Sequence, residues 1–562
     1  MEKQPTPPSS LKGSHTSLRD SSPKPTPQND EHQESFVYPS NGKLWLVMCS
    51  LYISIFLIAL DKTILATAVP RITDAFNSLS DIGWYGSSYM LTLCAFQLLW
   101  GRIYTFYSPK PVFLSAILVF EIGSAVCGAA PSSIAFILGR SIAGLGSAGM
   151  MNGAIVITMH TVPLAKRPMF QGLIGAVFGV ASVVGPLLGG VFTESVSWRW
   201  CFYINLPCGA VAIAILVLVL QLPARKDEER LTLVQQFWKM DPMGTVVFLP
   251  AVVCLILALQ WGGTTYEWSS WRIILLLVLF PILLLIFLVI QVRSPETATL
   301  PMRILLQRTI FASFIYSFFS QGSMLVTTYF IPLFFQALKN FSPISSGLAT
   351  LPSILSLVIG IILAGGLVQR FGYPAPFMIV SAVLSSIGAG LITTWKIEVG
   401  KNMWIGYQVL FGFGMGLGMQ QATMSAQVVL PRVDAPTGVS LMVFGQNLGG
   451  AVFISVAQNV FTDALASKLS AIPGVNLDKA MIVQMGATKI KEMVPMELLQ
   501  VVLQSYRAAI RNAFYVGLAM ACVSMVGAVA VEWRSVKGGE KMGNEIKAEE
   551  KAGNKADEKD IV

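Results

Sequence analysis

Long apolar runs constrain this chain more than any other feature of its sequence. About fourteen stretches of roughly twenty mostly apolar residues follow one another, separated by short polar segments. A run of that length is long enough to cross the hydrocarbon core of a bilayer as a helix. Only 12% of the residues are charged, about half the fraction usual in a soluble protein. The sequence therefore predicts an all-α, multi-pass membrane protein that contacts lipid.

The predicted spans leave a polar tail at each end of the chain. They cover residues 44–69, 82–104, 112–130, 134–159, 172–192, 201–220, 243–262, 273–292, 310–336, 344–368, 376–395, 403–429, 438–461 and 512–531. Residues 1–42 and 534–562 have too few apolar side chains to offset the entropy cost of ordering. We expect both tails to be disordered.

The basic residues orient the predicted spans. Alternate loops, starting with the one after the second span, contain more Lys and Arg than the loops on the opposite side. Their basic residues are Arg102, Lys110, Lys166, Arg167, Arg225, Lys226, Arg230, Lys239, Arg293, Arg303, Arg308, Arg370 and Arg432. Such loops are cytoplasmic by the positive-inside rule, which places both tails in the cytoplasm and a long loop, 462–511, outside. The net charge of +9 is thus an orientation signal, and no nucleic-acid partner is expected.

Two loops indicate an internal repeat. The segment from Gly101 to Lys110 follows the second span, and a similar segment from Gly365 through Arg370 to Gly372 follows the tenth. Duplicated halves are a common plan among transporters. We therefore expect a first six-helix half at 43–221, a second at 310–533, and a linker at 222–309 that contains two inserted membrane helices.

Three ionisable side chains stand out inside the predicted spans: Asp61, Glu121 and Arg140. A charge at that depth costs at least a few kcal/mol unless it has a partner or faces water. Asp61 lies about 25 Å along the first span from its cytoplasmic end, and Arg140 lies about 9 Å from the outer end of the fourth. We expect the two to pair across one cavity. The alternatives are a solvated Asp61 at the rim and a structural Arg140, and for Glu121 the structural interpretation is favoured.

Small residues form a stripe along the fifth span, at three- and four-residue steps. The stripe consists of Gly172, Gly175, Gly179, Ser182, Pro186 and Gly189, with Gly185 and Gly190 beside it. Small side chains at this spacing let two membrane helices approach closely, and the proline interrupts the backbone hydrogen bonding. The pattern favours a seam along which helices rock, with static packing as the alternative.

The spans of the second half carry amides and aromatic residues instead of charges. The candidates for substrate binding are Gln321, Tyr329, Gln420, Gln446 and Asn447. Together with nearby Met and Phe side chains they would hold an amphipathic organic molecule. Hydrogen bonding between helices is the alternative for each of them.

Other patterns exclude several function classes. The sequence has no phosphate-binding glycine loop, no metalloprotease motif and no cluster of Cys and His with metal-ligand spacing, so we expect neither enzyme activity nor a cofactor or metal. Asn340 begins an Asn-x-Ser sequon in a predicted external loop, which makes it a candidate glycosylation site.

These features resemble the major facilitator superfamily, and within it the fungal fourteen-spanner drug:proton antiporters. The similar motifs are Leu60-Asp61-Lys62-Thr63-Ile64 in the first span, Leu138-Gly139-Arg140 in the fourth, and Gly185-Pro186 with Gly189-Gly190 in the fifth. The resemblance implies that Arg140 takes part in proton coupling with Asp61. It also implies that the fifth-span motif is of the antiporter type and that the repeated loops take part in gating.

One motif departs from the family pattern. The superfamily has an Asp-Arg pair in the loop after the second span, whereas this chain has Thr105 and Phe106. Gating by an acid at this position is therefore not expected here.

The sequence as a whole favours a proton-coupled exporter of small amphipathic organic compounds, such as drugs, toxins or secondary metabolites, that works by alternating access. We expect a monomer in the cell membrane, with the vacuolar membrane as the alternative location. The alternative function is a proton-coupled importer of an iron chelate or nutrient on the same fold. A membrane sensor or intramembrane enzyme would need a soluble ligand-binding domain or a catalytic cluster, and neither is found in the sequence.

Overall fold

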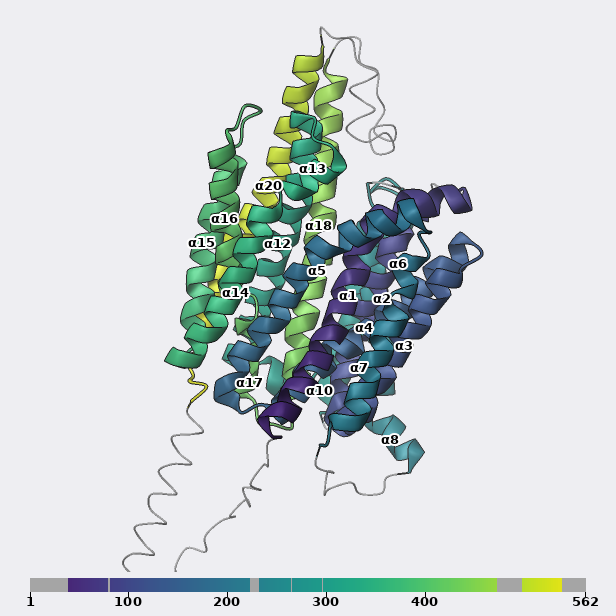
Figure 1. Cartoon of the computed structure of the whole chain (residues 1–562), viewed down its shortest axis with the longest axis vertical. Coiled ribbons are helices and arrows are strands. Elements are labelled where there is room, and N and C mark those ends of the chain that lie inside the picture. The colour runs from purple at the N-terminus through teal and green to yellow at the C-terminus, as the bar shows by residue number, and fades with distance from the viewer. Residues whose placement is uncertain are drawn as a thin grey trace, which may run out of the picture. The chain divides into compact units, whose positions relative to one another are not determined.

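A computed structural model describes residues 39–78, 81–222, 232–263, 265–295, 297–472 and 498–537. Within these ranges the chain is almost entirely helical, and the only β-type pairing is an isolated bridge between Gly262 and Tyr266. The predicted all-α class is confirmed. Twelve helices in the described part are long and apolar enough to cross a membrane. The predicted count of fourteen spans stays a prediction. It requires α2 and α16 to cross the membrane as well, and both run beside the twelve (Figure 1).

The first half consists of helices in two packed groups. Its elements are α1 (Asn41–Phe76), α2 (Ile82–Phe106), α3 (Pro109–Ala129), α4 (Ser133–Thr161), a short 3-10 turn η2 (Leu164–Lys166), α5 (Arg167–Ser195), α6 (Trp200–Tyr203) and α7 (Asn205–Val219). Helix α4 packs against α2 and α3, while α1 packs against α5 and α7. Glycine makes the α3–α4 contact possible, because a β-carbon on Gly146 would lie 2.7 Å from Cα of Phe120.

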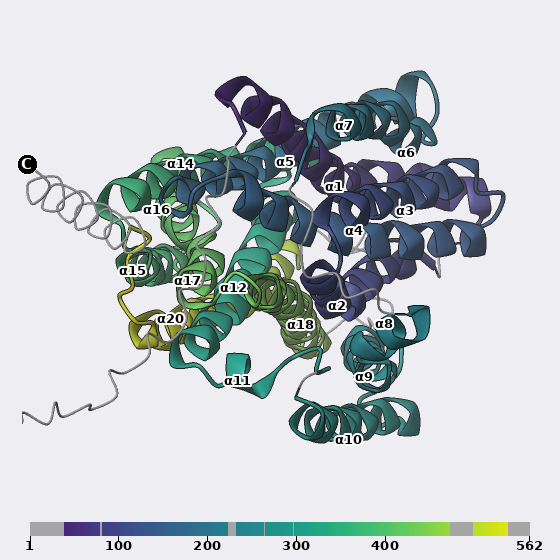
Figure 2. The same cartoon turned by 90° about the horizontal axis from the view of Figure 1, so that it is seen from below.

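The inserted helices lie on one side of the bundle. The segment contains α8 (Leu233–Lys239), α9 (Pro242–Trp261), α10 (Trp271–Arg293) and α11 (Met302–Leu305). Helices α9 and α10 pack against each other, and α9 also contacts α2 and α18 (Ala435–Ser470) (Figure 2). The ring of Phe248 lies 4.8 Å from that of Phe287 and 5.5 Å from that of Phe444. The inserted pair therefore covers the place where α2 of the first half meets α18 of the second.

The second half differs from the prediction in two places. Its helices are α12 (Arg308–Lys339), α13 (Pro343–Leu348), α14 (Leu351–Phe371), α15 (Ala375–Thr393), α16 (Lys401–Gly418), α17 (Gln421–Val429), α18 and α20 (Leu499–Ala530). The predicted span 403–429 is wrong as one helix, because it is interrupted at Met419 and Gln420. Four glycines at alternate positions precede the break and lower helix propensity. The predicted loop 462–511 is too wide, since α18 and α20 extend into it from both sides.

The predicted tails fall largely outside the described residues. Residues 1–38 and 538–562 are not described, and Asn41 and Gly42 already belong to α1. Residues 534–537 follow α20 and reach the end of α14, where the amide of Val536 donates to the carbonyl of Gly372 at 2.8 Å.

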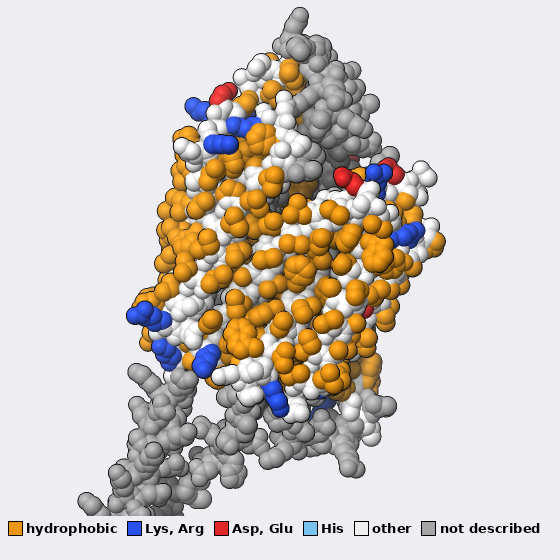
Figure 3. Space-filling model, in the orientation of Figure 1, with side chains coloured by type: hydrophobic (Ala, Val, Ile, Leu, Met, Phe, Trp, Pro, Cys, Tyr) orange, Lys and Arg blue, Asp and Glu red, His pale blue; other side chains and the backbone are white. Residues whose placement is uncertain are grey.

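The side-chain distribution suits a bilayer. Figure 3 shows a broad band of hydrophobic side chains over the face formed by α1, α5 and α14, with Lys and Arg side chains at both its upper and lower edges and Asp and Glu side chains mainly at the upper one. The lower edge, at which α1 begins, is therefore the more basic of the two in this view, in agreement with the predicted cytoplasmic orientation.

Candidate functional site

The expected pair between Asp61 and Arg140 is present. Nη1 of Arg140 on α4 lies 2.6 Å from Oδ2 of Asp61 on α1, and Nε of Arg140 donates to the carbonyl of Tyr85 at 3.0 Å. The Asp61 side chain is fully buried and that of Arg140 is 1% exposed. The alternative, a solvated Asp61 at the rim, is thereby wrong. Oδ1 of Asp61 has no hydrogen-bond partner among the described residues, so this carboxylate keeps one site for a proton or a water.

Aromatic side chains of α2 hold the arginine in place. The guanidinium carbon of Arg140 lies 4.5 Å from the centre of the Tyr89 ring, and the Tyr89 hydroxyl donates to Oγ of Ser147. Tyr85 and Tyr89 are one helical turn apart and both are buried. Because the carbonyl, the ring and the carboxylate all fix the guanidinium, Arg140 is a positioned group and not a mobile one.

Glu121 occupies a different place. Its carboxylate is buried between α3 and α7 against Gly209, and neither oxygen has a hydrogen-bond partner among the described residues. Helices α3 and α7 lie outside α1 and α4 in the first half (Figure 2). The favoured structural role of Glu121 stays a prediction.

The glycine stripe of α5 contacts different helices in its two halves. Near the start of α5, Gly172, Gly175 and Gly179 face α14 of the second half, with Ile361 Cγ2 2.9 Å from the β-carbon position of Gly175. Farther along, Gly185 and Gly189 face Thr63, Ile64 and Thr67 of α1. Pro186 is exposed within the helix, and Gly190 has no atom within 4 Å of its β-carbon position. One helix therefore carries both a contact within the first half and a contact between the halves.

The halves meet along two seams at the end where α1 begins. On one seam, Gly101 of α2 lies against Ser440 of α18, and Oγ1 of Thr105 lies 3.2 Å from Oγ1 of Thr437. On the other, the β-carbon position of Gly365 on α14 lies 2.7 Å from the carbonyl oxygen of Pro168. The neutral Thr105 thus makes the contact between halves at the position where the superfamily pattern has an acid.

Three other predicted gating residues do not face the opposite half. Lys110 donates to the carbonyls of Val217 and Leu220 at 2.9 and 2.7 Å, at the end of α7 in the same half. Arg370 is exposed in the last turn of α14, and the buried Gly372 directly follows that helix. There Lys537 donates to the Arg370 carbonyl at 2.6 Å. Gly372 has a φ of 93°, a left-handed conformation that glycine adopts without strain.

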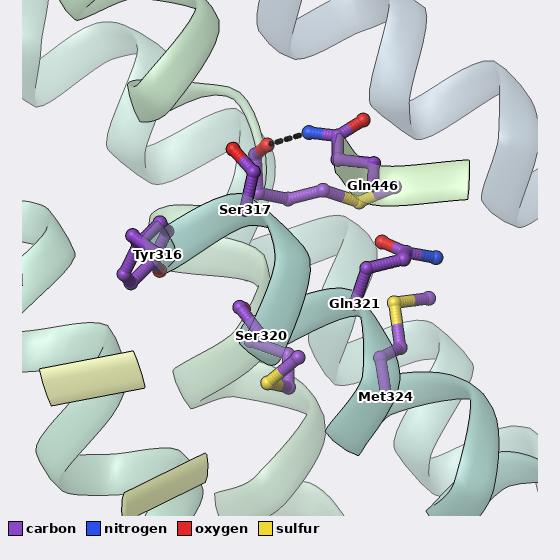
Figure 4. Close-up of a pocket in the computed structure, with 8 residues that line it drawn as sticks. Tyr316, Ser317, Ser320, Gln321, Met324 and Gln446 are labelled. Atoms are coloured by element: carbon purple, nitrogen blue, oxygen red, sulfur yellow. Dashed lines mark hydrogen bonds between the residues drawn. The ribbon is translucent and has the colours of Figure 1, made fainter. Parts of the chain in front are cut away.

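A pocket in the second half brings together part of the predicted substrate surface. It has an empty volume of about 250 Å³ and is lined by Tyr316, Ser317, Ser320, Gln321, Met324, Met415, Met419 and Gln446 (Figure 4). Nε2 of Gln446 donates to the carbonyl of Met419 at 3.2 Å, at the break between α16 and α17. Only about 10 Å³ of this space is cavity that a water molecule could occupy, so the pocket must widen before it can hold a drug-sized ligand. Its lining consists of hydroxyl, amide and thioether groups without a charge.

The remaining candidates lie outside this pocket. Gln420 is buried with its amide nitrogen 3.4 Å from the β-carbon position of Gly175, so it belongs to the contact between the halves. Tyr329 is 52% exposed, two turns beyond Gln321 on α12, and Asn447 is partly exposed beside Gln446. The exposed Asn340 ends α12 with a φ of 57°.

Sequence reasoning missed several residues of these sites. Tyr316, Ser317 and Ser320 share a helix face with Gln321, and that polar face was the signal for the pocket. Tyr85 and Tyr89 gave only a weak signal, because aromatic residues are common in apolar spans. Asp434 and Arg303, which form two hydrogen bonds of 2.5 and 2.7 Å between α11 and the start of α18, are 131 residues apart.

Comparison with known proteins agrees with this arrangement. The family model described as Major Facilitator Superfamily matches residues 51–454. The chain is 48% identical over 509 residues to an MFS-type efflux pump, MFS1, of Arthroderma benhamiae, which covers 90% of this chain and 95% of that protein. It is 47% identical to the efflux pump aflT of Aspergillus parasiticus (90% and 99% covered) and 48% identical to the rubrofusarin-specific efflux pump aurT of Gibberella zeae (90% and 92% covered).

Solved structures share the fold at low sequence identity. A double tryptophan mutant of XylE matches with a TM-score of 0.57 and 14% identity, covering 87% of this chain and 99% of XylE. A bacterial homolog of the human lysosomal transporter Spinster matches with a TM-score of 0.53 and 16% identity, covering 88% and 98%. The predicted resemblance is confirmed: this chain is a multi-pass membrane transporter that belongs to the major facilitator superfamily.

Proposed function

We propose that the chain exports small amphipathic organic compounds, such as drugs, toxins or secondary metabolites, in exchange for protons. The observation that carries the proposal is the buried pair of Asp61 and Arg140, in which one carboxylate oxygen is bound and the other has no partner. An Asp in this setting can take up a proton when the cavity opens to one side and release it on the other. Protonation would cancel the charge that holds Arg140.

The halves would move about the two seams that join them. With α5 in contact with α14 on one seam and α2 in contact with α18 on the other, the halves touch at the predicted cytoplasmic side. Alternating access requires these contacts to separate while contacts at the other end form. The substrate would bind near Gln321 and Gln446, because their pocket offers polar and apolar surface without charge.

Export is favoured over import by the relatives. The curated relatives at 47–48% identity that are described above are named efflux pumps, and one of them is named for rubrofusarin. We place the chain in the cell membrane as a monomer, with the vacuolar membrane as the alternative. Glycosylation of Asn340 is part of the same proposal, because its side chain is exposed at the predicted outer end of α12.

Transport in vesicles of known orientation tests the proposal. Inside-out vesicles are loaded at low internal pH, and uptake of rubrofusarin is measured while the proton gradient is imposed and then collapsed with an ionophore. Antiport predicts uptake that depends on protons leaving the vesicle. Movement of rubrofusarin in the same direction as the protons would instead support the importer.

A further inference from the structure

Lys62 follows Asp61 on α1, and neither the fold nor the proposed proton exchange uses it. Its side chain is partly exposed, whereas the neighbouring Asp61 is fully buried. Its Nζ lies 5.7 Å from the centre of the Tyr89 ring, the same ring that carries the guanidinium of Arg140. A lysine inside a membrane helix is costly unless an anion or water compensates its charge.

The protein does not supply an anion for this lysine. Asp61 is bound to Arg140, and among the described residues none forms a hydrogen bond or an ion pair with Nζ of Lys62. Glu121, the other buried carboxyl group of the first-half helices, lies against Gly209 of α7 instead. With Asp61 neutralised by Arg140, the cluster keeps one uncompensated positive charge beside an aromatic ring.

The surroundings indicate what would compensate that charge. Helix α4, which carries Arg140, also contacts α18, which carries Gln446, so the charged cluster and the uncharged pocket belong to helices that meet. The pocket contributes the thioethers of Met324, Met415 and Met419 but no cation. An acidic group on a ligand would supply the missing negative charge to Lys62, and an apolar body would suit the thioether surface of the pocket.

We infer that Lys62 binds the ionised acid group of the transported compound, and that the chain prefers amphipathic organic anions to their neutral analogues. This inference rests on the proposed export function and adds to it the charge of the substrate. The partly exposed Lys62 would donate from Nζ to the acid oxygens, while the buried Tyr89 ring beside it would hold the lysine side chain in place.

Equilibrium binding to the purified full chain in nanodiscs tests the inference. The probes are 1-pyrenebutyrate and its methyl ester, with empty nanodiscs as the blank for partition into lipid. We expect the wild type to bind the carboxylate at least tenfold more tightly than the ester. Lys62→Gln and Lys62→Met should each remove the preference, and Lys62→Arg should keep it. Lys401→Gln, which removes an exposed lysine at the start of α16, is the matched control and should keep it too.

Three results would overturn the inference. They are equal or absent binding of the two probes by the wild type, a preserved preference in the folded Gln and Met variants, and a preference lost equally in the control. A variant that changes the pH dependence of transport but not the preference would make Lys62 a positioning residue for Asp61. Because no proton gradient is present, the outcome is separate from that of the vesicle experiment, which tests export itself.

Discussion

Gly179 of α5 lies against the side chain of Val358 of α14 so closely that no β-carbon fits between them. One turn earlier, Ile361 Cγ2 lies 2.9 Å from the β-carbon position of Gly175. Helix α5 belongs to the first half and α14 to the second. Closure of the predicted cytoplasmic end therefore depends on the absence of side chains at these positions.

A large side chain at the contact between α5 and α14 should keep the cytoplasmic end open. We expect Gly179→Leu to lower transport at least tenfold at normal protein abundance, and to expose a cysteine placed at Thr437 on the neighbouring seam. The measurement is labelling of that cysteine by a membrane-impermeant maleimide in inside-out vesicles, with the exposed Cys49 and Cys522 replaced by serine.

Gly366→Leu on α14 is the matched control, because nothing lies within 4 Å of its β-carbon position. It should transport and label like the wild type. Normal transport by the Gly179 variant, or an equal loss in the control, would show that the contact between α5 and α14 does not control closure.

Removing Arg140 should destabilise the protein through the charge it leaves behind. Arg140→Leu strands the fully buried carboxylate of Asp61, and breaking a buried pair in this way costs about 3–5 kcal/mol. Adding Asp61→Asn should recover part of the loss, because the stranded group is then neutral. The melting temperature of the purified protein measures both effects. A double variant less stable than Arg140→Leu would mean that the pair does not account for the loss.

The pair between Arg303 and Asp434 should be a weak, salt-sensitive tie on the cytoplasmic side. Their two hydrogen bonds raise the pKa of Arg303, so it stays charged, but its side chain is 63% exposed and such pairs contribute about 1 kcal/mol or less. We expect Asp434→Asn to increase maleimide labelling of the cysteine placed at Thr437 two- to fivefold at low ionic strength. At about 1 M salt, where charges are screened within roughly 3 Å, the difference should vanish. Equal labelling of the wild type and Asp434→Asn at low salt would show that this ion pair does not help to close the cytoplasmic end.

Gln446 should affect substrate affinity more than turnover. Gln446→Leu removes an amide that lines the pocket and donates to the Met419 carbonyl. We expect KM to rise about three- to tenfold and kcat to stay nearly unchanged. A change of this size corresponds to the loss of one hydrogen bond, roughly 1 kcal/mol. Gln336→Leu, whose amide donates to Ser346 outside the pocket, is the control. A fall in kcat alone would place Gln446 in the conformational change instead.

Much of the fold follows from periodicity and charge in the sequence. Apolar runs predict the helices, and isolated charges inside them have few possible partners. Asp61 and Arg140 were therefore predictable as a pair from their depth alone. Small residues at three- and four-residue steps likewise predicted a close helix contact along α5.

Contacts between distant segments were not predictable in the same way. A glycine stripe says that a helix approaches but not which one, so the change of partner from α14 to α1 along α5 needed the structure. At the break, the carbonyl of Met419 accepts a hydrogen bond from Gln446 on another helix, a contact that the sequence does not reveal. Lys110 was expected at a gate, yet its side chain reaches the end of α7, because a long lysine side chain can extend to any nearby carbonyl.

The proposed role of Asp61 in proton exchange is tested most directly by comparing driven and undriven transport in Asp61→Asn. Proteoliposomes are assayed with the probe that the wild type transports, first with an imposed pH gradient and then for exchange of labelled against unlabelled probe at equal pH. Asp74→Asn, at an exposed position on the same helix, is the control. We predict that Asp61→Asn loses gradient-driven transport and keeps exchange, while the control keeps both. Gradient-driven accumulation by Asp61→Asn at the wild-type rate would contradict the account.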